Sequence, residues 1–196
     1  NPDKRVSRNK KKKNSVRQFA LSNNIALIEQ DDISDNRFIE NIKQKKADLF
    51  LVVAYKIIPK KIYSIPKYGA VNIHASLLPK YRGAAPIQRA LINGDDTTGI
   101  STFIINEKVD RGELIYQEKV SIKKDDSFGD LWTRLSCKGP RAIKRTLDLI
   151  RDGEKELASD IEMEPSYALK INKDELHIDW SEEANLIYNK VRAFSP

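Results

Sequence analysis

Two polar side chains, Asn72 and His74, stand two residues apart in the short apolar stretch Ala70–His74. In a β-strand this spacing puts both side chains on the same face. An amide N–H and an imidazole aimed at one point could stabilise a developing oxyanion, and each well-placed donor of this kind contributes about 2.7–4 kcal/mol in the transition state. The alternative is a hydrogen-bonded core histidine beside a strand-end turn residue, and the spacing alone favours that alternative.

Asp110 lies in the polar loop Asn106–Gly112, between two apolar stretches. A carboxylate is the usual partner of a catalytic histidine, because it can orient the imidazole or relay a proton. An Asp two residues before a Gly is also ordinary turn chemistry. Nothing in the spacing places Asp110 beside His74, so both interpretations stay open on these residues alone.

Helical and strand patterns alternate along the chain, which indicates an α/β domain. The largely apolar run Ala47–Tyr55 is typical of a strand buried on both faces of a parallel sheet. Ala70–His74 predicts a second strand, and polar residues at its end suit a ligand site, because ligands bind beyond the carboxyl ends of strands in open α/β sheets. Residues 100–105 and 113–122 predict two more strands.

Two helices are predicted with defined ends. Pro86 opens the first, which is expected to run to Asn93 with Gly94 as its stop. The second is a long amphipathic helix over residues 127–153. Pro140 is expected to break or kink it, because an interior proline removes a backbone hydrogen bond and clashes with the preceding turn.

Composition restricts the class of protein. The chain has 196 residues, 40% hydrophobic and 32% charged, which indicates one substantial globular domain, or one domain with a short appendage. No apolar run approaches the roughly 20 residues of a membrane span, and no secretory h-region is present. One cysteine, Cys137, and two histidines exclude an internal disulfide and a Cys/His zinc site, and no metal is expected. A cytoplasmic protein is the simplest interpretation.

Positive charge is concentrated near the start of a chain whose formal net charge is +7. Such a cluster attracts polyanions. Taken alone, the segment is interpreted as a solvated basic tail, and it becomes a binding element only if the chain uses a polyanionic substrate. Its basic residues are Lys4, Arg5, Arg8, Lys10, Lys11, Lys12, Lys13 and Arg17.

The run Asn72–Gln88, NIHASLLPKYRGAAPIQ, closely resembles the signature of the 10-formyltetrahydrofolate-dependent formyltransferases. Within it, Arg82–Gln88 is similar to the members that act on methionyl-tRNA, and less similar to those that act on amino sugars. The resemblance covers essentially the whole chain. Further matching segments are Val52–Tyr55, Gly94–Ile100, Val109–Gly112, Ile178–Trp180 and Arg192–Phe194.

The resemblance implies that Asn72, His74 and Asp110 are the catalytic residues of a transferase that uses 10-formyltetrahydrofolate as formyl donor. It implies that the donor is bound by the segment Ser76, Leu77, Leu78 and Pro79, and by Tyr55, Ile57 and Ile58 around its pterin ring. Two substitutions depart from the family's pattern near this pocket: Lys56 replaces a usual Gly, and Arg111 replaces a usual Thr.

The resemblance also implies a partner, the initiator methionyl-tRNA of translation initiation. The basic segment lies where these enzymes place a loop that reaches the tRNA acceptor stem, and Arg8, Lys10 and Lys11 match that loop's basic residues. Contacts to phosphates position a nucleic acid without reading its bases, and they weaken as salt rises.

The fold implied by the resemblance is a Rossmann-like parallel-sheet formyltransferase domain of the α/β class. Residues 1–153 would form this catalytic domain, with residues 4–17 as its basic loop, and residues 154–196 would be a linker and helix leading to an absent C-terminal β-barrel domain. The family's first βα unit has no counterpart ahead of Asn1. A monomer without membrane contact is expected.

Two other functions stay open. The absent first strand and C-terminal domain suit a catalytically weak or inert fragment that binds tRNA or folate. A formyltransferase acting on a nucleotide-linked amino sugar is the second, because the resemblance implies that Asn72, His74 and Asp110 are shared with enzymes of other acceptors and do not set the acceptor.

Overall fold

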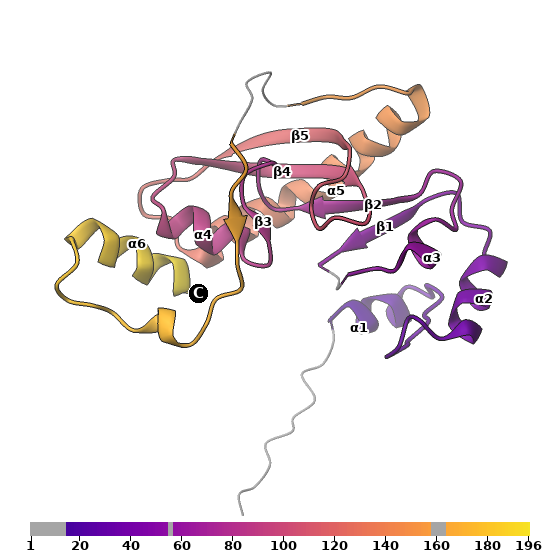
Figure 1. Cartoon of the computed structure of the whole chain (residues 1–196), viewed down its shortest axis with the longest axis horizontal. Coiled ribbons are helices and arrows are strands. Elements are labelled where there is room, and N and C mark those ends of the chain that lie inside the picture. Colours follow the sequence, from indigo (N-terminus) through magenta and orange to yellow (C-terminus); the bar gives the residue numbers. More distant parts are fainter. Residues whose placement is uncertain (1–14, 55–56, 158–163) are drawn as a thin grey trace, which may run out of the picture. The chain divides into compact units, whose positions relative to one another are not determined.

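The structure is a computed structural model that describes residues 15–54, 57–157 and 164–196. The chain forms two compact units, residues 1–40 and 41–196. The first unit contains α1 (Ser15–Ser22) and the beginning of α2 (Asn36–Gln44). All the strands that the structure describes belong to the second unit (Figure 1).

A four-stranded sheet organises the second unit. Its strands, in order across the sheet, are β1 (Phe50–Val53), β2 (Ala70–His74), β4 (Thr97–Ile104) and β5 (Leu114–Ser121). β1 and β2 are parallel, whereas β4 runs antiparallel to both of its neighbours. The α/β class is therefore confirmed, with an antiparallel hairpin extending the parallel pair.

The remaining elements lie between or after the strands of the main sheet. In chain order they are α3 (Lys60–Tyr63), β3 (Arg82–Gly83), α4 (Pro86–Ile92), α5 (Phe128–Asp152), β6 (Tyr167–Ala168), a 3₁₀ turn (Asp174–Leu176) and α6 (Ala184–Phe194). β3 and β6 pair in parallel, separately from the main sheet. α4 has the predicted ends, because Pro86 occupies its first turn and Asn93 is its C-cap.

α5 packs against β4 and β5 and provides much of the core. Ser127 caps its first turn by exchanging hydrogen bonds with Asp130, and Gly153 ends it with a left-handed backbone. Of the break or kink expected at Pro140, the break does not occur, because α5 is continuous through the proline. Buried residues lie on both sides of the proline, and their burial outweighs the roughly 3 kcal/mol cost of an interior proline. These residues are Leu131, Leu135, Ala142 and Leu149.

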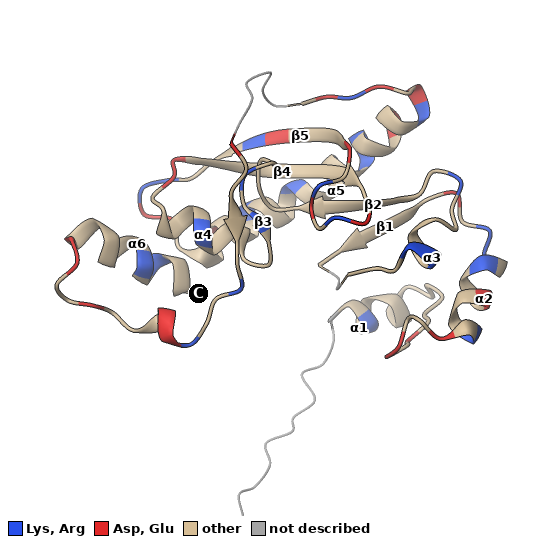
Figure 2. Ribbon diagram, in the orientation of Figure 1, with Lys and Arg blue, Asp and Glu red and all other residues tan. Residues whose placement is uncertain are grey.

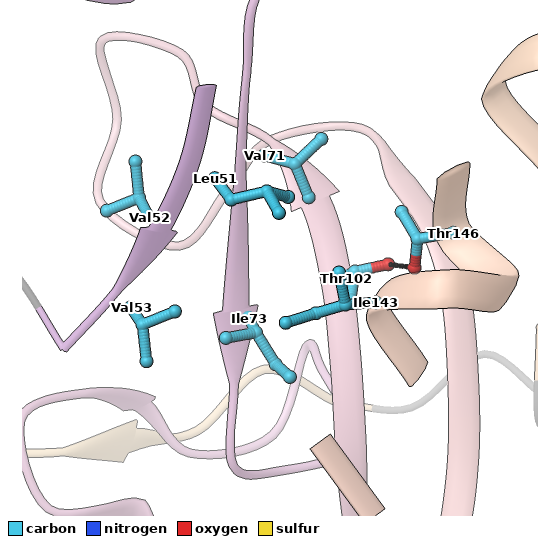
Figure 3. A pocket seen from close by; sticks show the side chains of 8 residues that line it. All are labelled: Leu51, Val52, Val53, Val71, Ile73, Thr102, Ile143 and Thr146. Carbon is cyan, nitrogen blue, oxygen red and sulfur yellow. Dashed lines mark hydrogen bonds between the residues drawn. The ribbon is translucent and has the colours of Figure 1, made fainter. Parts of the chain in front are cut away.

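An apolar pocket lies where α5 faces the sheet near β1 (Figure 3). Its lining residues are Leu51, Val52, Val53, Val71, Ile73, Thr102, Ile143 and Thr146. Its two hydroxyls satisfy each other, since Thr102 bonds Thr146 at 2.8 Å and Thr146 donates onward to the Ala142 carbonyl. This pocket therefore presents no free hydroxyl to a ligand.

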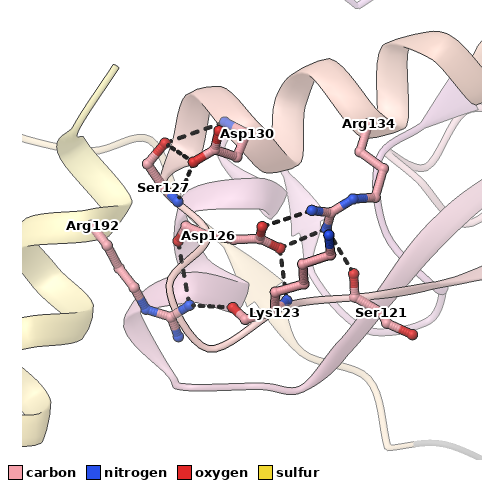
Figure 4. A network of polar contacts seen from close by, with 7 residues as sticks. All are labelled: Ser121, Lys123, Asp126, Ser127, Asp130, Arg134 and Arg192. Atoms are coloured by element: carbon pink, nitrogen blue, oxygen red, sulfur yellow. Dashed lines mark hydrogen bonds and ion pairs between the residues drawn. The ribbon is translucent and has the colours of Figure 1, made fainter.

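A polar network joins α6 to the beginning of α5 (Figure 4). The Asp126 carboxylate accepts two hydrogen bonds from Arg134, at 2.5 and 2.6 Å, and one from the Lys123 backbone N–H at 2.7 Å. The buried guanidinium of Arg192 donates to the backbone carbonyls of Lys123 and Asp126. The C-terminal helix is thus fixed to the domain through Arg192.

Replacing Asp126 by Ala is expected to lower the free energy of unfolding by about 1.5–3 kcal/mol at pH 7, because Arg134 and the Lys123 N–H lose a charged acceptor. The bonded Arg134 guanidinium holds the pKa of Asp126 below its usual range. Its contribution is therefore complete above the pKa of an unfolded aspartate, about 3.9, and is lost as the pH falls through the lower native pKa. Urea unfolding at neutral and acidic pH measures both effects.

The matched control is Asp152→Ala, which removes an exposed carboxylate that pairs with Arg151 at the end of α5, where acidic and basic residues lie together (Figure 2). This variant is expected to unfold as the wild type does, because exposed ion pairs contribute little. Equal losses of stability in the Asp126 and Asp152 variants would argue against the network. A loss at Asp126 that persists unchanged in acid would contradict the pKa assignment.

Candidate functional site

The end of β2 carries the two polar side chains that the sequence singled out. Val71 and Ile73 point into the pocket beneath α5 (Figure 3), so the alternating Asn72 and His74 point to the opposite face of the sheet. His74 is buried and Asn72 is half-buried. Within the described part of the chain, the Asn72 amide has no hydrogen-bond partner, which leaves its N–H groups available to a ligand.

Both ring nitrogens of His74 face oxygen atoms. Nε2 lies 2.8 Å from the carbonyl oxygen of Tyr81, and Nδ1 lies 3.9 Å from Oδ2 of Asp110. A neutral imidazole donates through only one nitrogen, whereas an imidazolium donates through both. Only the Tyr81 carbonyl lies within hydrogen-bond distance of the ring, whereas the Asp110 carboxylate lies near Nδ1 without bonding it.

Asp110 is held in place by β3. The Gly83 N–H donates to Oδ2 of Asp110 at 2.8 Å, and Nε of Arg82 donates to the Asp110 carbonyl at 2.9 Å. The backbone of Asp110 has a φ of +49°, a left-handed conformation that residues other than glycine adopt infrequently. The two hydrogen bonds thus fix a conformation that aims the carboxylate at His74.

The structure brings Asp110 to His74, although the two residues lie far apart in the sequence. The turn chemistry of the Asn106–Gly112 loop is carried by a different residue, because the Asn106 side chain accepts from the Lys108 N–H at 2.8 Å. The Asp110 carboxylate is instead directed out of its own loop, to Gly83 and His74.

The segment Ser76–Pro79 leaves β2 directly after His74 and is largely buried. Ser76 donates from its hydroxyl to the Lys80 carbonyl at 2.7 Å, and the Leu78–Pro79 peptide bond is cis. Two further side chains, Ser101 and Gln117, bind the backbone of this segment. Sequence reasoning missed both, because each lies within a strand read as apolar and only the strand register shows where it points.

The other residues expected at the donor pocket differ in their surroundings. Ile57 is 78% exposed, and Ile58 is partly buried. Tyr55 and Lys56 lie outside the described residues, as do the three basic residues expected to contact tRNA, Arg8, Lys10 and Lys11. Of the expected donor-pocket residues, the structure thus describes Ile57, Ile58 and the segment Ser76–Pro79.

The segment Ser166–Ala168, near the C-terminus, packs beside β3 and Tyr81. In β6, Tyr167 pairs with Arg82 and Ala168 pairs with Gly83. The Ser166 hydroxyl accepts from the Tyr81 N–H at 2.9 Å, which places it beside the carbonyl that bonds His74. Sequence reasoning missed this segment, since a two-residue strand carries no periodicity.

Arg111, which departs from the family's pattern, contacts the same segment. Its guanidinium donates to the Tyr167 hydroxyl at 2.6 Å. Arg111 therefore links the loop that carries Asp110 to strand β6.

The groups assembled around His74 are amide, imidazole and carboxylate side chains. Over residues 15–54, 57–157 and 164–196, no cluster of three or more His, Cys, Asp and Glu side chains could hold a metal ion. In the same ranges, no helix is long and apolar enough to cross a membrane.

Comparison with known proteins shows the family. The formyl transferase family matches residues 1–147. The methionyl-tRNA formyltransferase of Fusobacterium nucleatum is 39% identical over 196 residues, which cover 99% of this chain and 63% of the relative. That of Thermodesulfovibrio yellowstonii is 40% identical over 200 residues, covering 100% of this chain and 64% of the relative. The chain therefore spans less than two thirds of the length of these relatives.

A solved structure supports the fold. The N-formyltransferase from Helicobacter canadensis, in complex with folinic acid and dTDP-3-aminofucose, superposes with a TM-score of 0.66. It is 23% identical and covers 90% of this chain and 62% of that one. The Rossmann-like formyltransferase fold expected from the sequence is confirmed. With a family match over most of its length and relatives near 40% identity, the chain belongs to the formyl transferases.

Proposed function

We propose that this chain carries the catalytic site of a methionyl-tRNA formyltransferase, which moves a formyl group from 10-formyltetrahydrofolate to the α-amino group of initiator methionyl-tRNA. One observation carries the proposal. His74 lies between the Tyr81 carbonyl and the Asp110 carboxylate, with Asn72 beside it on the same face of the sheet. The relatives at 39% and 40% identity, which are named methionyl-tRNA formyltransferase, support the acceptor.

In the proposed reaction the amine nitrogen attacks the formyl carbon of the donor. The formyl oxygen gains negative charge, the bond from carbon to N10 breaks, N10 takes up a proton and the amine loses one. A free α-amino group has a pKa of about 7.7–8.0, so a neutral, nucleophilic fraction exists at physiological pH. The site has two tasks, which are to stabilise the oxyanion and to move the proton.

The geometry around His74 suits both tasks. The distance of 3.9 Å from Nδ1 to Asp110 is too long for a direct hydrogen bond, so this N–H remains available to a reacting group. Together with the Asn72 amide it would bind the oxyanion, while the Asp110 carboxylate balances the imidazolium charge and helps to carry the proton from amine to N10.

The substrates are assigned to the segments that the family resemblance identified. The proposed donor site comprises Ser76, Leu77, Leu78 and Pro79, with Tyr55, Ile57 and Ile58 around the pterin ring. The proposed tRNA contacts are Arg8, Lys10 and Lys11, and binding through them would weaken as salt rises.

The proposed catalytic domain is residues 1–153, and residues 154–196 form the proposed linker and helix that follow it. In support of this division, β6 pairs with β3 and α6 packs against α4, which would anchor the linker and helix on the domain. We also propose that the protein acts in the cytoplasm, where charged tRNA is available, and that it acts as a monomer.

Formyl transfer from labelled 10-formyltetrahydrofolate tests the proposal, with methionyl-tRNA and a nucleotide-linked amino sugar offered in parallel to the protein expressed from its complete reading frame. Label is expected on methionyl-tRNA and not on the sugar. Transfer to the sugar alone would replace the proposed acceptor. Folate binding without transfer to either acceptor would identify a binding fragment instead of an enzyme.

Gly83→Ala is expected to lower kcat about 10²-fold, because a displacement of about 1 Å in a catalytic group such as Asp110 has an effect of this size. A Cβ at this position would lie 2.6 Å from the Ala168 carbonyl oxygen, and φ is +124°. The clash would push β6 away from β3 and displace the N–H that holds Asp110. Steady-state rates at saturating donor and acceptor measure the effect.

Gly153→Ala is the matched control. Gly153 also has a positive φ, +72°, but no atom lies within 4 Å of the added Cβ. This variant is expected to lose about 1–2 kcal/mol of stability through backbone strain alone, with an unchanged kcat. If both alanine variants keep the wild-type rate, β3 does not position Asp110.

A further inference from the structure

A row of side chains crosses the sheet beside the proposed site. His74 on β2 is directly opposite Ser101 on β4, and Ser101 is directly opposite Gln117 on β5. Residues directly opposite one another on neighbouring strands point to the same face. Ser101 and Gln117 therefore share the face of His74, and they are 0% and 5% exposed.

The two side chains are joined to each other and to the segment that follows His74. The Ser101 hydroxyl donates to the Ser76 carbonyl at 2.7 Å and accepts from the Leu78 N–H at 3.0 Å. Nε2 of Gln117 donates to the Leu78 carbonyl at 2.7 Å and to the Ser101 hydroxyl at 3.0 Å. Both backbone polar groups of Leu78 are thus bound by these two side chains.

This arrangement solves a specific problem for the chain. Ser76 and Leu78 are buried after the chain has left β2, so their backbone groups lack a neighbouring strand of the main sheet to pair with. Buried backbone groups need partners, and here side chains from β4 and β5 supply them. An apolar pair at positions 101 and 117 would fill the space but leave these groups unsatisfied.

We propose that Ser101 and Gln117 are positioning residues for the formyl donor. They fix the backbone position of the Ser76–Pro79 segment beside His74, in the conformation that binds the folate. The inference rests on the proposed function for the identity of the ligand. Neither side chain bonds His74, so both act through the segment and not on the reacting atoms.

Ser101→Ala and Gln117→Met remove the hydrogen-bonding groups with little change in size. Each is expected to raise the Kd for tetrahydrofolate and the KM for 10-formyltetrahydrofolate about tenfold, the effect of losing a buried hydrogen bond of ordinary strength, while kcat changes little. Equilibrium titration with tetrahydrofolate and steady-state kinetics on the complete protein measure these constants.

Thr102→Val is the matched control. Thr102 follows Ser101 on the same strand, is fully buried, and bonds Thr146 of α5, so its side chain points to the face opposite Ser101. This variant is expected to lose a comparable amount of stability in urea unfolding while binding tetrahydrofolate as the wild type does. The comparison separates a general loss of stability from a displacement of the Ser76–Pro79 segment.

The outcomes distinguish this inference from the proposed function. If the wild type transfers formyl groups and the Ser101 and Gln117 variants bind tetrahydrofolate normally, the positioning role is wrong and the function stands. If the wild type binds tetrahydrofolate but transfers to no acceptor, the function fails, and weaker binding by both variants still supports the positioning role. A wild type that does not bind tetrahydrofolate overturns the inference.

Discussion

His74→Ala is expected to slow formyl transfer by at least about 10²-fold at saturating donor and methionyl-tRNA, because the variant loses a donor to the oxyanion and a path for the proton. The affinity for tetrahydrofolate is expected to change little, since the proposed donor segment Ser76–Pro79 remains in place. Rapid-quench measurement of the chemical step, with a separate binding titration, gives the two quantities independently.

The chain contains a matched control in its second histidine. His177 is exposed and follows the 3₁₀ turn near the C-terminus. His177→Ala is expected to transfer formyl groups at the wild-type rate. A His74→Ala variant that also keeps this rate would remove the imidazole from the mechanism.

Asp110→Asn is expected to lower kcat by about 10²-fold or more, because the imidazolium loses its balancing charge and the proton loses its relay. The amide oxygen of the new side chain can still accept from the Gly83 N–H, so the stability of the fold should be retained. Asp110→Ala removes this acceptor as well, and is expected to lose stability in addition to activity. Unfolding curves and kcat values for the two variants separate the effect of losing the carboxylate charge from the effect of losing the hydrogen bond with Gly83.

Glu107 provides the control for Asp110. It is a carboxylate in the same loop, but it is exposed and pairs with Lys60 at 2.9 Å. Glu107→Gln is expected to leave kcat unchanged. Similar rate losses for the Glu107 and Asp110 variants would show that the loop responds to any loss of charge, and that Asp110 has no special role.

Helix ends were predictable from the sequence because local chemistry determines them. α4 begins at Pro86, whose missing N–H costs nothing in the first turn of a helix. The cap at Ser127 begins α5, and the left-handed Gly153 ends it. The break expected at Pro140 was wrong because it depends on distant contacts and not on local chemistry. Whether an interior proline interrupts a helix depends on what the rest of that helix buries, and burial against β4 and β5 is a property of the whole domain.

The site shows the same division between local and distant information. The alternation of side chains along a strand was enough to place Asn72 and His74 on one face. Their contact with Asp110 depends on β3, on the left-handed backbone of Asp110 and on the Gly83 N–H, which no spacing in the sequence encodes. Without the family resemblance, Asp110 would have remained one turn residue among others.

The residues that support the site were even less predictable from the sequence. Ser101 and Gln117 lie in strands that contain several other polar residues, so nothing in the sequence singles them out, and their common target became visible only through the register of β4 with β5. The Ser166–Ala168 segment lies in a polar stretch without periodicity and acquires its role only by pairing with β3. Residues that support a site from a distance are those that sequence patterns describe least.

Single-turnover formylation of methionyl-tRNA by the complete protein, compared with the double variant Asn72→Ala/His74→Ala, tests the central claim most directly. The wild type is expected to place the formyl group of 10-formyltetrahydrofolate on the methionyl amine. The double variant is expected to bind tetrahydrofolate but to form no more product than the uncatalysed control. Product formation by the double variant at the wild-type rate, or a wild type that binds both substrates without transferring the formyl group, would contradict the assignment of this face of β2 as the site of formyl transfer.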